Sequence, residues 1–207
     1  MKKVSIVSTG ILLLGVCLFI SQMGCDQAPN EKADTSSTSK ELSRGELIAR
    51  GNYLVTIASC SDCHSPKIFT PQGPVPDSTK LLSGHPAEAP LMPIDKKVLT
   101  PGNWILISPD LTAFAGPWGI SYTANLTPDT ATGIGAWTDD VFIQTIRTGK
   151  HLGQEGGRPI LPPMPWYYVS KCTDEDLKAI FAYLRSLPPI INKVPAPTPP
   201  DEVVKMK

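Results

Sequence analysis

The chain has 207 residues, with 19 basic and 19 acidic side chains and therefore no net formal charge. This balance does not favour a nucleic-acid-binding protein, which usually carries an excess of Lys and Arg. The hydrophobic content of 41% is ordinary for one globular domain, whereas the 22 prolines favour long ordered loops over helices packed throughout.

The first 24 residues have the features of an export signal. Two lysines precede an apolar run from Val4 to Ile20, which is short for a membrane span of about 20 apolar residues. Cys25 follows a glycine and resembles the lipid-bearing first residue of a bacterial lipoprotein, although Gln22 stands where that pattern has a leucine-like residue. We expect residues 1–24 to be a lipoprotein-type signal and Cys25 to be lipidated. The alternatives are ordinary cleavage and an uncleaved anchor.

Residues 25–42 are rich in Ser, Thr, Asp, Glu and Lys and have almost no large apolar side chain. This composition is typical of a flexible tether. The segment 43–190 is then expected to be the folded domain, placed on the periplasmic side of a bacterial membrane by the lipid.

The folded part opens with a predicted helix that ends near Ala58. Ser43 and Glu46 form a capping-box pattern, and the apolar residues that follow form a broad hydrophobic face. Gly51 lies inside this helix, where glycine costs about 1 kcal/mol relative to alanine. A close crossing with another helix would explain it.

The motif Cys60-Ser61-Asp62-Cys63-His64 follows this helix and is the attachment pattern for a c-type haem. Its spacing lets Cys60 and Cys63 form thioethers with one edge of the porphyrin, while His64 reaches the iron from the adjacent face. A structural zinc site needs four ligands, and only Cys172, His85 and His151 remain elsewhere. A redox-active cysteine pair would need a thioredoxin-like context that the flanking sequence lacks.

Residues 65–117 form a long segment interrupted by ten prolines and four glycines, in which only Trp104–Ile107 hints at a short strand. We expect a proline-rich loop that wraps the haem edge or presents a docking surface. A turn at Asn125–Asp129 follows. A second helix is then expected, with Thr138 as its cap, Asp139 and Asp140 in its first turn and Gly149 at its end.

Residues 161–166, Leu-Pro-Pro-Met-Pro-Trp, cannot be helical because the three prolines restrict the backbone. This strap should hold Met164 in a fixed position. Thr173 then caps a last helix with an apolar stripe, which Pro188-Pro189 ends. Residues 191–207 are expected to form a proline-rich tail extended on the surface.

A six-coordinate haem needs a second axial ligand, and Met164 is the best candidate. It lies in the rigid strap shortly before the last helix and far in sequence from His64. His151 is the next candidate, whereas His85 and Met92 are interpreted as surface or packing residues of the proline-rich segment. A thioether ligand stabilises ferrous iron, which favours electron transfer over oxygen activation.

The order of these elements resembles the class I cytochrome c fold, so we expect an all-α domain around one covalent haem with a long proline-rich insertion. In that family the terminal helices cross at a glycine packed against an aromatic residue, and Gly51 with Tyr53 and Tyr183 with Leu184 stand at the matching places. Within the family the chain is most similar to cytochrome c subunits of periplasmic alcohol and gluconate dehydrogenases. This resemblance rests on residues 125–129, 132–137, 163–166 and 174–189.

The resemblance implies a carrier of single electrons between a dehydrogenase donor and an oxidase or cytochrome acceptor, not a catalytic enzyme. The chain departs from those subunits in having one Cys-x-x-Cys-His motif where they have several, which argues against a multi-haem relay within it. Two alternatives remain. One is a haem enzyme or gas sensor with an open sixth position, and the other is a haem-bearing structural subunit of a larger complex.

Overall fold

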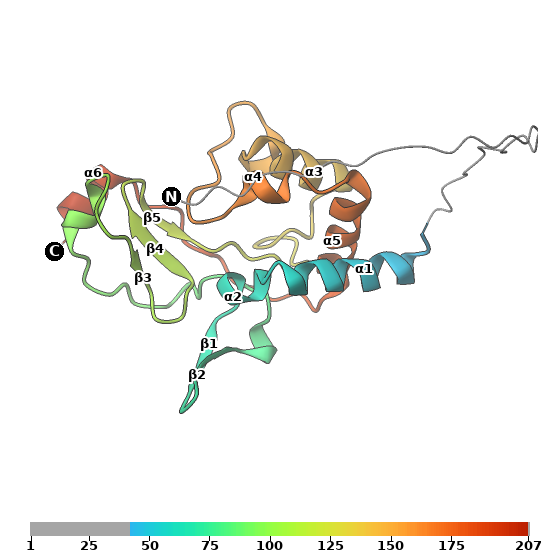
Figure 1. The fold of residues 1–207 in the computed structure, drawn as a ribbon, viewed down its shortest axis with the longest axis horizontal. Coiled ribbons are helices and arrows are strands. Elements are labelled where there is room, and N and C mark those ends of the chain that lie inside the picture. Colours follow the sequence, from blue (N-terminus) through green and yellow to red (C-terminus); the bar gives the residue numbers. More distant parts are fainter. Residues whose placement is uncertain (1–41, 207) are drawn as a thin grey trace, which may run out of the picture. The chain divides into compact units, whose positions relative to one another are not determined.

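The computed structural model describes residues 42–206. The predicted export signal, Cys25 and almost all of the predicted tether therefore lie outside the described residues. The elements of the described part follow in the order α1 (Arg44–Ile57), α2 (Cys60–His64), β1 (Lys67–Thr70), β2 (Gly73–Pro76), η1 (Ser78–Lys80), η2 (Lys96–Leu99), β3 (Leu106–Ile107), β4 (Ala113–Gly116), β5 (Gly119–Tyr122), α3 (Asp139–Thr148), η3 (His151–Gly153), α4 (Trp166–Val169), α5 (Asp174–Ser186) and α6 (Pro200–Lys205) (Figure 1). Within this part of the chain, no helix is both long enough and apolar enough to cross a membrane.

The three long helices begin where the capping residues predicted. Ser43 accepts a hydrogen bond from the backbone of Glu46, whose carboxylate accepts one in return, so the capping box of α1 is complete. At the starts of α3 and α5, the hydroxyls of Thr138 and Thr173 accept hydrogen bonds from the backbone amides of Val141 and Asp176. Gly149 ends α3 in the left-handed conformation, with a φ of 65°, which glycine adopts without a steric cost.

Helices α1 and α5 lie against each other and cross at Gly51 (Figure 1). A Cβ atom added at Gly51 would overlap the carbonyl oxygen of Ala179 and lie 2.7 Å from the Cβ of Tyr183. The prediction of a close helix crossing is therefore confirmed, with Tyr183 as the aromatic partner. Tyr53 does not share this role, because its side chain is exposed.

The main core lies among α1, α3 and α5. Phe142 of α3 stacks on Phe181 of α5, with ring centroids 4.9 Å apart, and Leu82 joins them from the segment after β2. This first core cluster consists of the buried side chains of Val55, Leu82, Ile134, Phe142, Ile143, Ile146, Leu177, Ile180, Phe181 and Leu184.

The all-α expectation describes only the helical part of the structure, because two small antiparallel sheets lie in the described residues. Strands β1 and β2 form a hairpin, and β3, β4 and β5 form a three-stranded sheet in that order. Four of these strands lie in the segment 65–117 that was predicted to be a loop, and only β3 coincides with the hint of a strand at Trp104–Ile107. A strand is recognised in a sequence by the alternation of polar and apolar residues. These strands are four residues or shorter, which is too short for the alternation to be clear. Strand β4 is also buried along its whole length, so it has no polar face.

The C-terminal segment also differs from the predicted extended tail. Thr198 pairs with Ile120 of β5, and residues 200–205 form α6, whose Val203 is buried. Val203 packs with Val98, Ala115 and Ile120 in a second core cluster. The apolar side of the sheet needs a cover, and the tail supplies it, which explains why this segment does not lie free on the surface.

The crossing of α1 and α5 gives the first testable prediction. Gly51→Ala should lower the free energy of unfolding by at least about 2 kcal/mol, because the backbone of Ala179 cannot make room for a methyl group without separating the helices. Urea denaturation followed by circular dichroism measures this loss. Gly45→Ala, in the same helix, is the matched control because a Cβ atom there meets nothing within 4 Å. It should leave stability unchanged or raise it by up to about 1 kcal/mol, and equal losses in the two variants would contradict the prediction.

Candidate functional site

Helix α2 places the two cysteines and the histidine of the motif together. Ser59 adopts a left-handed conformation, with a φ of 53°, and turns the chain from α1 into α2. Cys63 and His64 are three and four residues after Cys60, so the three side chains share one face of the turn. The sequence-predicted attachment residues are thus brought to one surface.

The thiols of this turn are protonated at neutral pH. Cys60, Cys63 and Cys172 are free cysteines. Burial raises the pKa of the Cys60 thiol to about 11, and burial also raises the pKa of the Cys63 thiol. Reactive dithiol motifs instead lower the pKa of the attacking cysteine, so the surroundings of α2 do not favour a redox-active cysteine pair.

The imidazole of His64 is buried and held by one hydrogen bond. Its Nδ1 lies 2.8 Å from the carbonyl oxygen of Ala124, and a carbonyl can only accept, so the hydrogen is on Nδ1. Burial lowers the pKa of His64, which keeps the ring neutral. The second nitrogen, Nε2, therefore keeps the lone pair that a metal ligand needs, and the carbonyl contact is the kind that orients metal-binding histidines.

Three segments that are distant in sequence meet to position Ala124. The amide of Gly84 donates to the carbonyl oxygen of His64 (2.7 Å). The amide of His85 donates to the carbonyl oxygen of Thr123 (2.9 Å), and the amide of Leu126 donates to that of Leu82 (2.8 Å). Residues 82–85 thus lie between the end of α2 and residues 123–126. This cross-linked arrangement fixes where the carbonyl of Ala124 points.

Two asparagine amides, the buried Asn125 and the half-buried Asn192, connect the arrangement to the C-terminal segment. Asn125 accepts from the amide of Thr127 (2.9 Å) and donates to the carbonyl oxygen of Ile190 (2.8 Å). Asn192 donates to the carbonyl oxygens of Ser83 (2.7 Å) and His85 (2.9 Å). Asn125 belongs to the turn that the sequence analysis identified, but its link to residue 190 could not be predicted, because it joins positions far apart in the chain.

The strap that carries Met164 is fastened to β5. The hydroxyl of Ser121 donates to the carbonyl oxygen of Pro162 (2.6 Å), and Nε1 of Trp118 donates to the Ser121 hydroxyl (3.2 Å). At the other end of the strap, the ring of Trp166 lies over Gly149, where no side chain could fit. Met164 itself is half-buried.

The strap and His64 are anchored to the same short stretch of chain. Ser121 binds the strap and Ala124 binds the imidazole. These two residues are three positions apart, so their Cα atoms are separated by no more than about 11 Å. Strand β5 and the residues after it therefore bring the two predicted iron ligands into one region, although they are 100 positions apart in the sequence. The sequence analysis missed Ser121, and no local signal marks it.

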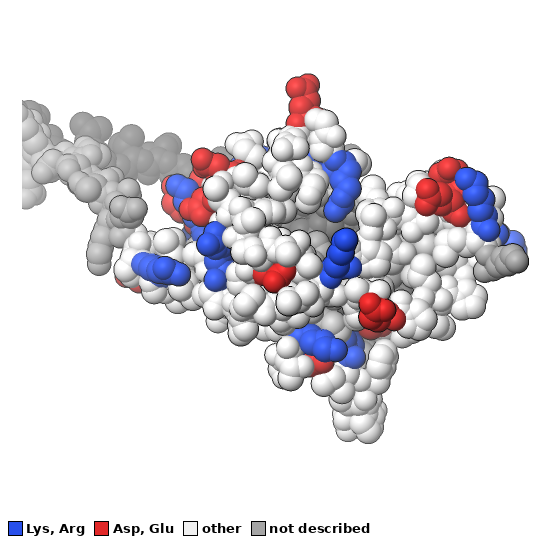
Figure 2. All heavy atoms as spheres, turned by 180° about the vertical axis from the view of Figure 1, so that it is seen from behind, with Lys and Arg blue, Asp and Glu red and all other residues white. Residues whose placement is uncertain are grey.

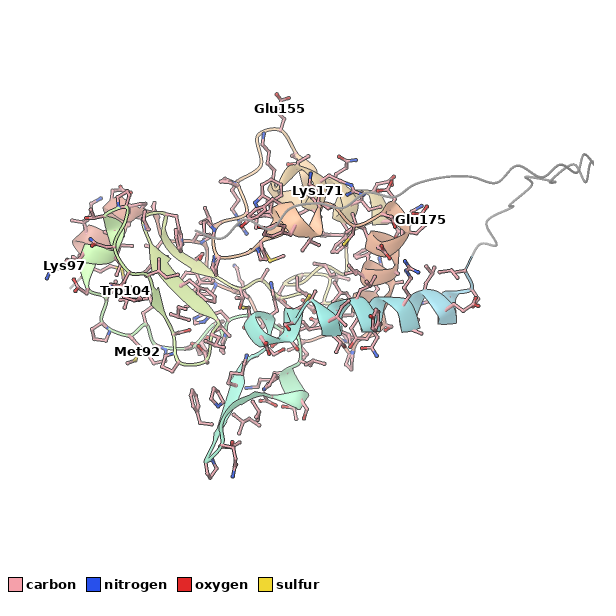
Figure 3. All side chains as sticks on the ribbon, in the orientation of Figure 1. Met92, Lys97, Trp104, Glu155, Lys171 and Glu175 are labelled. Carbon is pink, nitrogen blue, oxygen red and sulfur yellow. The ribbon has the colours of Figure 1, made fainter. Side chains whose placement is uncertain are left out.

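The other candidate ligands have different surroundings. The side chain of Met92 is 62% exposed and lies on the periphery of the described chain (Figure 3). His151 is exposed and meets the ring of Trp137 edge-on, with centroids 5.9 Å apart. His85 is buried, so it is a packing residue and not a surface one.

The contacts of His85 hold its ring between two neighbouring segments. Its Nδ1 lies 2.7 Å from the hydroxyl oxygen of Thr112, which itself donates to the carboxylate of Asp110 (2.6 Å). The ring of Tyr122 covers the imidazole, with centroids 4.9 Å apart. This cluster ties the segment after β2 to β4 and β5.

One buried polar side-chain atom has no hydrogen-bond partner within residues 42–206. It is the hydroxyl oxygen of Thr123, next in sequence to the carbonyl that holds the imidazole. Buried hydroxyls are almost always hydrogen-bonded, so this one fits a neighbouring polar group that is not part of the described chain. Together, the two neighbouring thiols of α2, the oriented histidine and this hydroxyl fit covalently attached haem, as in the c-type class of haem proteins.

The cytochrome c family model matches residues 48–188. The chain therefore belongs to the cytochrome c family, whose members bind haem c covalently. This confirms the resemblance on which the fold expectation was based, with the two sheets as an addition to the helical frame.

Known relatives are cytochrome subunits of dehydrogenases. The fructose dehydrogenase cytochrome subunit of Gluconobacter japonicus is 26% identical over 82% of this chain. The gluconate 2-dehydrogenase cytochrome c subunit of Pantoea cypripedii is 29% identical over 66%, and the quinone alcohol dehydrogenase cytochrome c subunit of Gluconacetobacter polyoxogenes is 32% identical over 69%. The matched regions cover 26%, 22% and 25% of those longer proteins, respectively.

Proposed function

We propose that this chain is a monohaem cytochrome c that carries single electrons between exported, membrane-associated redox proteins. In this proposal the thioethers of Cys60 and Cys63 hold the haem, and His64 and Met164 are the axial ligands. The observation that carries it is the shared anchoring of the imidazole and the methionine strap to residues 121–124. Bound haem supplies the iron that alternates between the ferric and ferrous states.

The residues around the site would restrict the movement of both proposed iron ligands. The bond from Nδ1 of His64 to Ala124 fixes the ring plane and makes Nε2 a better donor to iron. The bond from Ser121 to Pro162 holds the strap, so Met164 does not have to be reorganised when the charge on the site changes. A thioether in this position raises the reduction potential relative to a second histidine. Both effects suit electron transfer.

The relatives supply the partner part of the proposal. They are the cytochrome subunits of fructose, gluconate and alcohol dehydrogenases, so the donor we propose is an exported dehydrogenase. The acceptor is an oxidase or another cytochrome. We also propose that lipid on Cys25 and the tether of residues 25–42 hold the domain at the periplasmic face of a membrane. Tethering raises the local concentration of the carrier near membrane-bound partners, so each docking contact can remain weak.

The central test of the carrier function combines haem content with ligand access. The purified protein should keep one haem per chain through extraction with acidified organic solvent, measured by the pyridine haemochrome spectrum. Ascorbate should reduce it in a single one-electron step. Carbon monoxide should bind the reduced form poorly at neutral pH, because a protein ligand occupies the sixth position. If the chain is instead a haem-bearing structural subunit of a larger complex, the isolated protein should exchange electrons with ascorbate but with no redox protein.

Ready binding of carbon monoxide would favour the competing proposal, a haem enzyme or gas sensor with an open sixth position. Haem that leaves on extraction, or a stoichiometry near two, would contradict attachment at the single Cys60–Cys63 pair.

The identity of the distal ligand has its own test. Ferric wild-type protein should show the weak near-infrared band of a sulfur-to-iron bond, and Met164→Ala should abolish this band and lower the reduction potential. Met92→Ala is the matched control, because its side chain is largely exposed and its removal should leave both the band and the potential unchanged. The opposite pattern would identify Met92 as the sixth ligand of the iron. Absence of the band from the wild-type protein would point to a nitrogen ligand such as His151.

Lipid attachment is tested in the full-length chain. Expressed in a bacterium that processes lipoproteins, the wild-type protein should incorporate radiolabelled palmitate and partition with the membranes. Cys25→Ser should abolish the label, whereas Cys172→Ser should retain it. An unlabelled wild-type protein would leave ordinary cleavage or an uncleaved anchor as the explanation.

A further inference from the structure

The β1–β2 hairpin projects from the rest of the described chain directly beside the haem motif (Figure 1). Strand β1 begins three residues after His64. The ammonium group of Lys67 donates to the carbonyl oxygens of Asp62 and Ser65, at 2.6 Å each. The amide of Asp77 donates to the carbonyl oxygen of Pro66 (2.8 Å) and closes the base. The hairpin is therefore joined firmly to the end of α2.

Both faces of this hairpin are apolar and exposed. Ile68 is opposite Val75 on one face, and Phe69 is opposite Pro74 on the other. The side chains of Ile68, Phe69 and Val75 are 52%, 63% and 44% exposed. No residue from 68 to 76 is charged, and Figure 2 shows an uncharged projection with acidic and basic residues only around its base.

A two-stranded hairpin without a covering layer is marginally stable in water, and apolar side chains exposed on both of its faces add to the cost. The structure holds the hairpin through bonds at its base and not by burying its faces. Such an element gains most of its stabilisation when another surface covers it, which is the property of a docking element.

The edges of the hairpin show how a partner would bind it. Pro66 and Asp77 form a hydrogen-bonded pair, and residues of an antiparallel pair alternate between inward and outward bonding. Pro74 and Pro76 therefore occupy outward positions of β2, where they offer no N–H group. The β2 edge therefore cannot pair fully with a further strand. This favours recognition through the exposed side chains, inserted into an apolar groove.

The charges favour a protein groove over a lipid surface. Interfacial membrane-binding elements combine apolar residues with lysines or arginines that face the headgroups, and residues 68–76 have none. The nearest lysine, Lys67, turns back to the carbonyls of α2. A strand of four residues is about 13 Å long, so the tip of the hairpin is close to its base at α2. A protein that binds the hairpin therefore also lies close to the haem motif.

We propose that the β1–β2 hairpin is the docking element of this cytochrome, which inserts Ile68, Phe69 and Val75 into an apolar groove beside the redox centre of its electron-transfer partner. This inference rests on the proposed carrier function and adds the surface and the chemistry by which the partner is recognised. Removal of the apolar side chains should therefore slow electron exchange with that partner and leave the haem itself unaffected.

The test compares two double variants. Ile68→Thr/Phe69→Thr removes apolar bulk but keeps residues that favour strands. Trp104→Thr/Ile107→Thr removes two exposed apolar side chains at and just before β3 and is the matched control. The probe comes from solubilised membranes of the bacterium that makes this protein. These membranes are fractionated, and the fraction that exchanges electrons fastest with the wild-type cytochrome is used. Stopped-flow rates at several concentrations give the second-order constant, and ascorbate reduction reports on the haem alone.

The second-order rate constant of the hairpin variant with this fraction should be about tenfold lower than that of wild type, or lower still. Its rate of reduction by ascorbate should stay within twofold of wild type, and its haem spectrum should be unchanged. The control variant should match wild type in both measurements. Equal rates for the two variants would overturn the docking role. So would loss of binding to phosphatidylglycerol vesicles, or a wild-type dimer that becomes monomeric, in the hairpin variant only. If ascorbate reduces the wild type but no fraction does, the carrier function itself fails.

Discussion

The hydrogen bond from Nδ1 of His64 to the carbonyl oxygen of Ala124 is the interaction on which the proposed haem site depends. It decides which imidazole nitrogen is free and where that nitrogen points. The bond exists only because residues 82–85 join the end of α2 to residues 123–126 through three backbone hydrogen bonds. A short local motif therefore obtains a defined ligand geometry from segments 20 to 60 positions away.

The segment predicted to be an insertion loop is part of this construction. Its sheet provides β5, which carries Ser121 at the strap and leads directly to Ala124. The C-terminal segment supports the sheet in turn, through the pairing of Thr198 with Ile120 and the buried side chain of Val203. The additional sheet and the tail thus stabilise the same stretch of chain that holds both predicted ligands.

The helical frame and the hairpin have opposite properties. At Gly51 the helices α1 and α5 approach so closely that no side chain fits between them, which makes the frame rigid close to the motif. The hairpin, by contrast, exposes apolar residues on both faces and is tied down only at its base. A rigid site limits the structural change that accompanies electron transfer, while an uncovered element beside it is available to select a partner. The difference between the helical frame and the hairpin follows from how completely each is packed.

The sequence by itself determined the elements whose signals are local. The caps of Ser43, Thr138 and Thr173 predicted the starts of three helices, Gly51 predicted a close crossing, and the cysteine–histidine motif predicted covalent haem, which the family assignment supports. Only the tertiary structure decided which carbonyl orients His64 and which hydroxyl holds the strap. It also decided that β1, β2 and β4 form within the segment 65–117, where the sequence hinted only at the strand that is β3, and that residues 200–205 form a helix. Those contacts join residues far apart in the chain, and four-residue strands are stabilised by their neighbours more than by their own side-chain pattern.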